Sequence, residues 1–252
     1  MSIETELSAL IGGLPDGMSE GVALGTGLVD GFDFYESAIG KVVVTFNPEG
    51  VSSLDIADKD FEDRFSQRFE RPLMRAEAPG SWGKHISPAI EAGRPGKLPV
   101  DLRSVTAFQA DVLGRTATIP KGEVRPYAWL ANEVHRPNAV RAAGSAVAKN
   151  PIPLIIPCHR VVRADGHIGN YSLGGPENKV DLLEHEGTRP DWLEGLATKH
   201  VRFQGDSSTS VVCHPTCHAI RRSKSADVIS FRSLGEAKDE GFRPCEVCRP
   251  CC

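Results

Sequence analysis

Cys158 and His159 form a pair that could carry out nucleophilic chemistry. They lie in residues 150–171, NPIPLIIPCHRVVRADGHIGNY, where a proline-braced apolar segment is followed by a turn-rich loop. Cysteine reacts as its thiolate, so a reactive cysteine needs a neighbouring base or positive charge. His159 and Arg160 are candidates for that group. The alternative is that Cys158 is an unreactive core residue, because free cysteine also packs as a small hydrophobic side chain.

Chain geometry limits how His159 can act on Cys158. Adjacent residues of an extended chain point to opposite faces, so direct contact requires a bend, and a bridging water is the other relay. An expected helix downstream offers Glu186, with His185 beside it, to orient the imidazole. A Cys-His hydrolase is disfavoured, because the sequence shows no oxyanion loop or partner pattern for acyl transfer.

A second group of cysteines near the C-terminus has metal-ligand spacing. A C-x3-C pair and a C-x2-C pair are separated by 27 residues, and their members are Cys213, Cys217, Cys245 and Cys248. This pattern predicts a tetrahedral zinc site with four thiolate ligands, and in a reducing cytosol such clustering indicates metal rather than disulfides. The ion would supply much of the folding free energy of so small a domain. Cys251 and Cys252 are expected to be spare thiols.

The composition is that of an ordinary globular protein. The chain has 252 residues, 40% hydrophobic and 25% charged, with no long apolar run and no leader-like N-terminus. We therefore expect a cytoplasmic protein without membrane contact. The net charge is -4, but residues 1–100 hold 9 Lys/Arg against 16 Asp/Glu. Any nucleic-acid contact should therefore use the rest of the chain.

The first hundred residues have the pattern of an α/β domain, which we expect over residues 1–98. In residues 29–57 apolar runs alternate with turn signals, which predicts two or three strands. In residues 60–74 phenylalanine recurs every four positions, which predicts a helix that buries one face in the core. Residues 78–98 are rich in proline and glycine and are expected to loop over the surface.

The next part predicts a helical domain over residues 99–192. Helices are expected, the first behind a cap at Ser104, at residues 104–113, 126–135, 139–149 and 175–186. The turn at Pro137 and Asn138 makes the second and third a helix-turn-helix, and the third is rich in Ala, Gly and Ser, which allows close approach to a nucleic-acid groove. Residues 190–208 would bridge to a cysteine-rich domain at 205–252.

The stretch around Cys158 resembles a known active-site signature. PCHRVVRADGHIGNYSLGG is similar to the signature of the O6-alkylguanine-DNA alkyltransferases, and the similarity extends upstream through GEVRPYAWLANEVHRPNAVRAAGSAVAKNP. The resemblance implies an RNase H-like α/β domain followed by a helical domain with a winged helix-turn-helix motif. It also implies irreversible, single-use transfer of an alkyl (methyl) group from O6-alkylguanine in double-stranded DNA to Cys158, by a monomer and without a cofactor. The alternative is a noncatalytic sensor or regulator of alkylated DNA, although alkyltransferase-like binders lack the acceptor cysteine that is present here.

The resemblance assigns roles to the residues around Cys158. It implies that His159 takes the thiol proton through water, that Glu186 is the partner of the imidazole, and that Asn150 is a hinge whose amide ties down neighbouring backbone.

The resemblance also assigns DNA contacts. Tyr127 would press on the phosphate of the target nucleotide and hydrogen-bond the purine, and Arg141 would enter the stack where the guanine leaves. Flipping is needed because an atom inside a duplex is out of reach, and a side chain in the gap offsets part of the unstacking. Gly144 and Ser145 would let their helix approach the minor groove.

Three further residues would recognise the flipped base. Tyr171 and Ser172 would donate hydrogen bonds to the purine ring nitrogen and the departing oxygen, which improves guanine as a leaving group. The Val161 carbonyl would accept from the exocyclic amine. Leu173 departs from the family's usual Asn-Tyr-Ser-Gly-Gly, so the loop over the pocket is expected to differ in shape.

The tail, VVCHPTCHAI…ISFRSLGEAKDEGFRPCEVCRP, resembles the metal-binding domain of the bacterial adaptive-response protein Ada. This resemblance implies that Cys213 accepts methyl groups from DNA phosphotriesters, which would lower the negative charge of the site and raise DNA affinity. His214 replaces the family's arginine, and much of the upstream sheet is expected to be missing. The alternative is a zinc unit that only stabilises the chain or adds nonspecific DNA contact.

Overall fold

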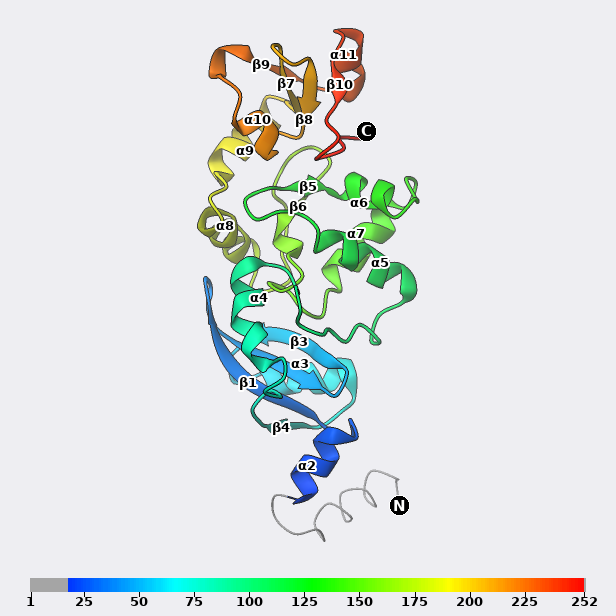
Figure 1. The fold of residues 1–252 in the computed structure, drawn as a ribbon, viewed down its shortest axis with the longest axis vertical. Helices are drawn as coiled ribbons and strands as arrows, with labels where there is room; N and C mark the ends of the chain where they lie inside the picture. The colour runs from blue at the N-terminus through cyan, green and yellow to red at the C-terminus, as the bar shows by residue number, and fades with distance from the viewer. Residues whose placement is uncertain (1–17, 252) are drawn as a thin grey trace.

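The computed structural model describes residues 18–251, which form three parts along the long axis in Figure 1. A four-stranded sheet with its helices lies at one end, a group of helices occupies the middle, and a second four-stranded sheet with the cysteine-rich tail lies at the other end. In the part of the chain that the structure describes, no helix is both long and apolar enough to cross a membrane.

The first sheet has the strand order β3-β2-β1-β4, with an antiparallel meander followed by a strand parallel to β1. Its elements are α2 (Met18–Gly25), β1 (Asp30–Ser37), β2 (Gly40–Asn47), β3 (Gly50–Ile56), α3 (Phe61–Phe69) and β4 (Leu73–Arg75). Side chains alternate along β2, so Val43 packs with Phe61 of α3 while Val42 and Val44 face the main core. The strands and the phenylalanine helix predicted from the sequence are therefore present.

Part of the segment expected to loop over the surface is helical instead. Residues 83–92 form η1 (Gly83–His85) and α4 (Ile86–Ala92). Ile86, Ala89 and Ile90 recur at helical spacing and are buried in the main core, so the prediction of a loop over residues 78–98 is wrong there. Pro88 does not prevent the helix, because it stands in the first turn, where its missing N–H has no intrahelical acceptor.

The middle part consists mainly of helices. Its elements are α5 (Ala107–Thr116), β5 (Arg125–Pro126), α6 (Tyr127–Glu133), α7 (Val140–Ala148), η2 (Cys158–Arg160), β6 (Val161–Val162), α8 (Pro176–His185) and α9 (Pro190–Thr198). The cap of α5 is Thr106 and not Ser104, because Thr106 and Gln109 hydrogen-bond each other's backbone N–H as a capping box. The expected bridge over residues 190–208 is also wrong, because α9 and the following strand fill most of it.

One hydrophobic core joins the first sheet to the middle helices. It contains Val42 and Leu54 from the sheet and Leu113, Leu130 and Ala146 from α5, α6 and α7. The buried segment 152–156, which leads into Cys158, runs through the same core. Cys158 is therefore held by packing from both halves of the chain.

The cysteine-rich part contains the second sheet, of order β10-β8-β7-β9. Its elements are β7 (Phe203–Asp206), β8 (Val211–Cys213), α10 (His218–Arg221), η3 (Ser225–Asp227), β9 (Val228–Phe231), α11 (Leu234–Asp239) and β10 (Arg243–Pro244). The upstream strand β7 pairs with both β8 and β9, and Phe203, Phe231 and Phe242 form a small core. The expectation that much of this upstream sheet is missing is therefore wrong.

Candidate functional site

Cys158 lies in a bend beside a cavity. The chain turns into η2 at this residue and is not extended, so the side chains of Cys158 and His159 are not forced to opposite faces. Cys158 is 3% exposed and borders a cavity of about 220 Å³. The cavity is lined by Tyr127, Val147, Ala148, Cys158, Asn170, Tyr171 and Ser172. The first helix of the α6–α7 pair, the end of α7, and the loop before α8 thus meet at the sulfur.

The imidazole of His159 is oriented by Glu186. Its Nε2 lies 2.9 Å from Oε1 of Glu186. Although burial raises the pKa of Glu186, hydrogen bonds from His159 and Arg160 hold that pKa at about 2, so the carboxylate can only accept. Nε2 therefore carries the proton. Burial lowers the pKa of His159 below its usual value, which keeps the ring neutral. Nδ1 is left as an acceptor, buried and without a hydrogen-bond partner among the described residues.

Arg160 holds this arrangement in place and is itself 1% exposed. Its Nε and Nη2 donate to the two oxygens of the Glu186 carboxylate at 2.8 and 2.6 Å, which is a bidentate interaction. Nη1 donates to the carbonyls of Gly93 and Ile119 at 3.0 and 2.7 Å, and Nη2 also lies 3.1 Å from the Ala92 carbonyl. A Cβ at Gly93 would overlap the guanidinium, so only glycine fits there. The sequence suggested Arg160 as an activating charge, whereas in the structure it positions Glu186.

A buried lysine that the sequence analysis missed lies near Cys158. Lys179 of α8 is 1% exposed, and its Nζ donates to the carbonyls of Val161 and Ile168 at 2.6 and 2.7 Å. Burial lowers the pKa of Lys179 to about 8. Burial also raises the pKa of the Cys158 thiol, while the Asn150 amide and the Lys179 charge oppose that rise. A signal was available, because Lys179 precedes buried Leu182 and Leu183 by three and four positions and so shares their helix face.

Asn150 fixes the backbone that leads to Cys158. Its Nδ2 donates to the Ile156 carbonyl at 2.8 Å, and its Oδ1 accepts from the Ile152 N–H at 3.0 Å. The amide thus ties together both ends of the buried segment. The structure therefore places the Asn150 side chain where a tie between neighbouring backbone groups was expected.

The loop before α8 provides the other wall of the cavity. Tyr171 is buried, and its hydroxyl interacts with the Cys158 thiol, which opposes the rise of the thiol pKa caused by burial. Ser172 is exposed at the cavity, whereas Leu173 turns into the main core and is 4% exposed. The Val161 carbonyl already accepts from Lys179, which leaves one lone pair for another donor.

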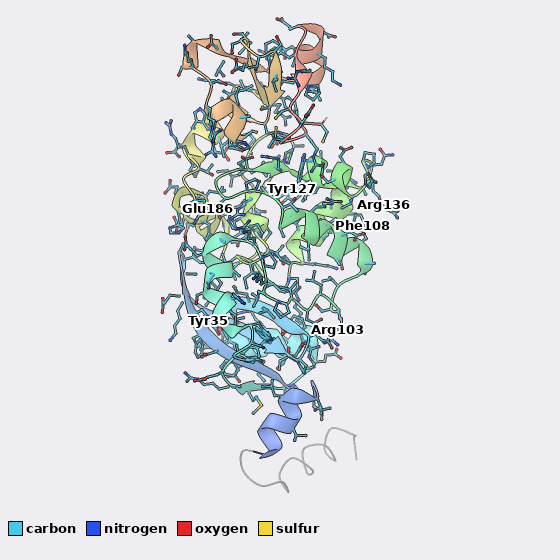
Figure 2. The ribbon with its side chains drawn as sticks, viewed as in Figure 1. Tyr35, Arg103, Phe108, Tyr127, Arg136 and Glu186 are labelled. Atoms are coloured by element: carbon cyan, nitrogen blue, oxygen red, sulfur yellow. The ribbon has the colours of Figure 1, made fainter. Side chains whose placement is uncertain are left out.

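The α6–α7 pair stands beside the cavity. Tyr127 opens α6, and Figure 2 shows it across the middle part from Glu186, with Arg136 at the outer edge of the pair. Gly144 of α7 faces Tyr127, since a Cβ there would lie 3.8 Å from the ring. Arg141 and Ser145 are exposed on α7, and no ion pair of the Arg141 guanidinium is found among the described residues.

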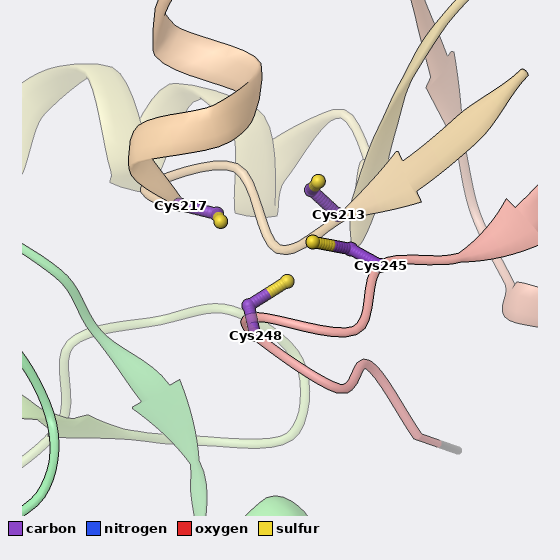
Figure 3. Close-up of side chains that lie close together, drawn as sticks. All are labelled: Cys213, Cys217, Cys245 and Cys248. Carbon is purple, nitrogen blue, oxygen red and sulfur yellow. The ribbon is translucent and has the colours of Figure 1, made fainter. Parts of the chain in front are cut away.

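The four cysteines of the tail converge on one point, as Figure 3 shows. All four are buried, and their sulfur atoms lie within 4.8 Å of one another. Thiolates about 2.3 Å from a tetrahedral Zn²⁺ would lie somewhat under 4 Å apart, so the arrangement fits the ion. The backbone N–H of His214 also donates to the Cys248 sulfur at 3.4 Å. These cysteines form a zinc site; Cys251 packs against the main core, and Cys252 lies outside the described residues.

A buried cysteine with a histidine–carboxylate pair beside a cavity defines a protein that takes a group onto cysteine. Comparison with known proteins identifies the family. Residues 107–188 match "6-O-methylguanine DNA methyltransferase, DNA binding domain", and residues 198–251 match "Metal binding domain of Ada". A methylated-DNA–protein-cysteine methyltransferase of Methanosarcina barkeri is 34% identical over 57% of this chain and 89% of its own length. The chain therefore belongs to the methylated-DNA–protein-cysteine methyltransferase family.

Other relatives match over a smaller share of their own length. The bifunctional transcriptional activator/DNA repair enzyme Ada of Escherichia coli is 36% identical over 59% of this chain, which spans 43% of that protein. The chain spans 39% of the rat methylated-DNA–protein-cysteine methyltransferase, at 49% identity over 32% of its own residues. The solved structure of Mycobacterium tuberculosis OGT in complex with DNA is 31% identical, with a TM-score of 0.50, and the match covers 65% of this chain and 98% of that one.

Proposed function

We propose that the protein repairs DNA by moving an alkyl group from O6 of guanine irreversibly to the sulfur of Cys158. The observation that carries this proposal is the position of Cys158, which borders a cavity large enough for a single base while its neighbour His159 is oriented by Glu186. Family membership gives the substrate class. No cofactor takes part in this transfer.

The side chains around the sulfur allow a simple reaction sequence. Nδ1 of neutral His159 accepts the thiol proton of Cys158 through one bridging water, and Glu186 stabilises the imidazolium that forms. The thiolate attacks the alkyl carbon, so the sulfur–carbon bond forms as the carbon–O6 bond breaks. The electron pair stays on guanine, and the hydroxyl groups of Tyr171 and Ser172, which line the cavity, stabilise it by hydrogen bonding. The thioether has no route back to a thiol, so each molecule acts once.

Base recognition uses groups that still have hydrogen-bonding capacity. We assign the purine ring nitrogen and the leaving oxygen to Tyr171 and Ser172, and the exocyclic amine to the Val161 carbonyl, whose second lone pair is open. Asn150 acts indirectly, because its amide holds the segment that carries Cys158.

The α6–α7 pair is assigned to DNA as a winged helix-turn-helix motif. Gly144 and Ser145 allow α7 to enter the minor groove, exposed Arg141 fills the gap left by the flipped guanine, and Tyr127 presses on its phosphate. This motif belongs to an alkyltransferase domain over residues 99–192.

We also assign the domains on either side of the alkyltransferase domain. We assign an RNase H-like fold to the domain predicted at residues 1–98, of which residues 18–98 are described, on the ground that an antiparallel meander is followed by a strand parallel to its first strand. The Ada-like zinc domain, predicted at residues 205–252, begins by Phe203, because β7 belongs to its sheet. We further propose that the protein acts as a monomer in the cytoplasm, where thiols remain reduced.

Mass mapping tests the function directly. A duplex with one O6-methylguanine is incubated with the zinc-loaded protein, and peptides are analysed for an added methyl group on Cys158. Cys158→Ala should accept nothing, whereas Cys251→Ala, which alters a cysteine away from the cavity, should accept one methyl per molecule. Methylation that persists in Cys158→Ala would refute the assignment.

Transfer from phosphotriesters to Cys213 remains a prediction from sequence. Its sulfur belongs to the zinc site, and the residue is 1% exposed. A DNA phosphotriester would therefore reach this sulfur only after the surrounding segments move.

A further inference from the structure

The cysteine-rich part contacts the middle part on both sides of Tyr127. The first of these contacts precedes β5. The hydroxyl of Thr216, between Cys213 and Cys217, accepts from the Val124 N–H at 2.8 Å. One residue earlier, the buried Glu123 carboxylate accepts from the backbone N–H of His218 at 3.0 Å. The C-x3-C pair thus holds the chain immediately before β5.

The second contact is made by the C-x2-C pair and lies on α6. The indole N–H of Trp129 donates to the carbonyl of Cys248 at 3.0 Å, and Trp129 is 3% exposed. Arg249 forms an ion pair with Glu133 at 2.5 Å, and the Glu133 side chain is 7% exposed. A buried hydrogen bond, and an ion pair between exposed Arg249 and buried Glu133, therefore attach this pair of cysteines to the helix that Tyr127 opens.

Tyr127 lies between these two anchors along the chain. Residues 123–124 are held on one side and Trp129 on the other, and Tyr127 lines the cavity of Cys158. One ion bound by both cysteine pairs would fix the distance between the two anchors. The anchored segment also reaches the relay, because the Gly122 N–H donates to Oε2 of Glu186 at 3.3 Å.

We propose that the zinc-loaded four-cysteine domain is a positioning element for alkyl transfer, which holds Tyr127 and α6 in the geometry that accepts a flipped nucleotide. The proposal rests on the proposed function at Cys158. Zinc contributes here through the placement of side chains and takes no part in the transfer itself. The positioning residues are Trp129 and Arg249, and neither lines the cavity.

The test separates use of duplex DNA from chemistry at the sulfur. Trp129→Phe with Arg249→Gln removes both attachments to α6 and keeps an aromatic ring at position 129. We expect the second-order rate of transfer from duplex O6-methylguanine to fall about tenfold, the loss that corresponds to about one buried hydrogen bond. Transfer from free O6-benzylguanine base, which needs no flipping, should change by less than about threefold.

Matched variants control for charge and folding. Arg243→Gln removes an exposed arginine of the same domain and should leave both rates within about twofold. Arg249→Lys alone keeps the charge and the Trp129 hydrogen bond and should keep most of the duplex rate. Bound zinc is measured in every variant. Equal losses with duplex and free base, or no loss with duplex, would overturn the proposal.

A third measurement distinguishes this proposal from the function on which it rests. Trp82→Phe with Trp192→Phe leaves Trp129 as the sole tryptophan of the three in the chain. Removal of zinc should shift its emission to longer wavelength and weaken binding to undamaged duplex about tenfold. If wild type transfers no alkyl group at all, the proposed function fails; unchanged emission and unchanged duplex affinity on zinc removal would instead refute the positioning role.

Discussion

Replacement of Glu186 by glutamine tests the energetics of the site most directly. The Glu186 carboxylate accepts from His159 and Arg160, and its side chain is 6% exposed. Its pKa is lowered from 4.5 to about 2, which at about 1.4 kcal/mol per pKa unit corresponds to about 3 kcal/mol in favour of the folded state at neutral pH. Glu186→Gln should therefore lower the free energy of unfolding by about 3 kcal/mol at pH 7.

The dependence on pH has a defined sign. Because the folded-state pKa of Glu186 is lowered, its contribution is fully present above pH 4.5 and is lost as the pH falls towards 2. Denaturant unfolding of wild type and Glu186→Gln from pH 7 to pH 3 should show the difference between them shrink below about pH 4.5. Glu184→Gln, an exposed neighbour on α8, is the control and should change stability by less than about 0.5 kcal/mol.

The same variant should slow alkyl transfer. A glutamine can present its amide N–H₂ to His159, which favours the tautomer with the proton on Nδ1 and removes the acceptor that the proposed proton transfer needs. A loss of about 10²- to 10⁴-fold in single-turnover rate is expected, the range for general-base catalysis. A Glu186→Gln protein with wild-type rate, or a stability difference independent of pH, would contradict the relay.

Other changes address separate parts of the structure. Arg141→Ala should slow transfer from duplex DNA by at least about tenfold but leave the rate of transfer from free O6-benzylguanine unchanged, because only a duplex has a gap in its base stack after the guanine has flipped out. Equal losses in the two single-turnover rates would argue against this role. Lys179→Met leaves the backbone carbonyls without a donor and should lower the free energy of unfolding, measured with denaturant, by roughly 3 kcal/mol. An unchanged free energy of unfolding would show that these buried hydrogen bonds do not stabilise the fold. Cys245→Ser should release zinc, as metal analysis would show, and retained stoichiometric zinc would exclude the four-cysteine site. Labelled methyl phosphotriester DNA given to Cys158→Ala should label Cys213 if that sulfur is a second acceptor, and an unlabelled Cys213 would refute the transfer predicted from the sequence.

The sequence predicted elements with strong periodicity and missed short ones. The three strands of residues 29–57 and the phenylalanine helix were predictable because their apolar residues alternate or recur every four positions. The seven-residue helix α4 was missed, since flanking proline and glycine indicated a loop. Strand β7 was also missed, because a four-residue strand offers too few positions for alternation.

At the site, sequence reasoning named residues by their own chemistry, and their catalytic roles stay predictions. Cys158, His159 and Glu186 were predicted, and the structure brings His159 and Glu186 together. The position of Arg160 depends on carbonyl groups at the end of α4, far away in the chain, which no local spacing reveals. The hydrogen bond from Trp129 to Cys248 joins residues 119 positions apart, so local spacing in the sequence could not predict it either.

Arg160 forms hydrogen bonds with residues from both halves of the chain, and this limits how far the protein can be shortened. A fragment that began at residue 99 would retain Cys158 and Glu186 but would lose Ala92 and Gly93, two of the carbonyl acceptors of that guanidinium. Its positive charge would then face solvent along an apolar surface stripped of α4 and the first sheet. Transplanting the reactive loop into a smaller scaffold would therefore require a replacement for this distant helix end as well as the signature residues.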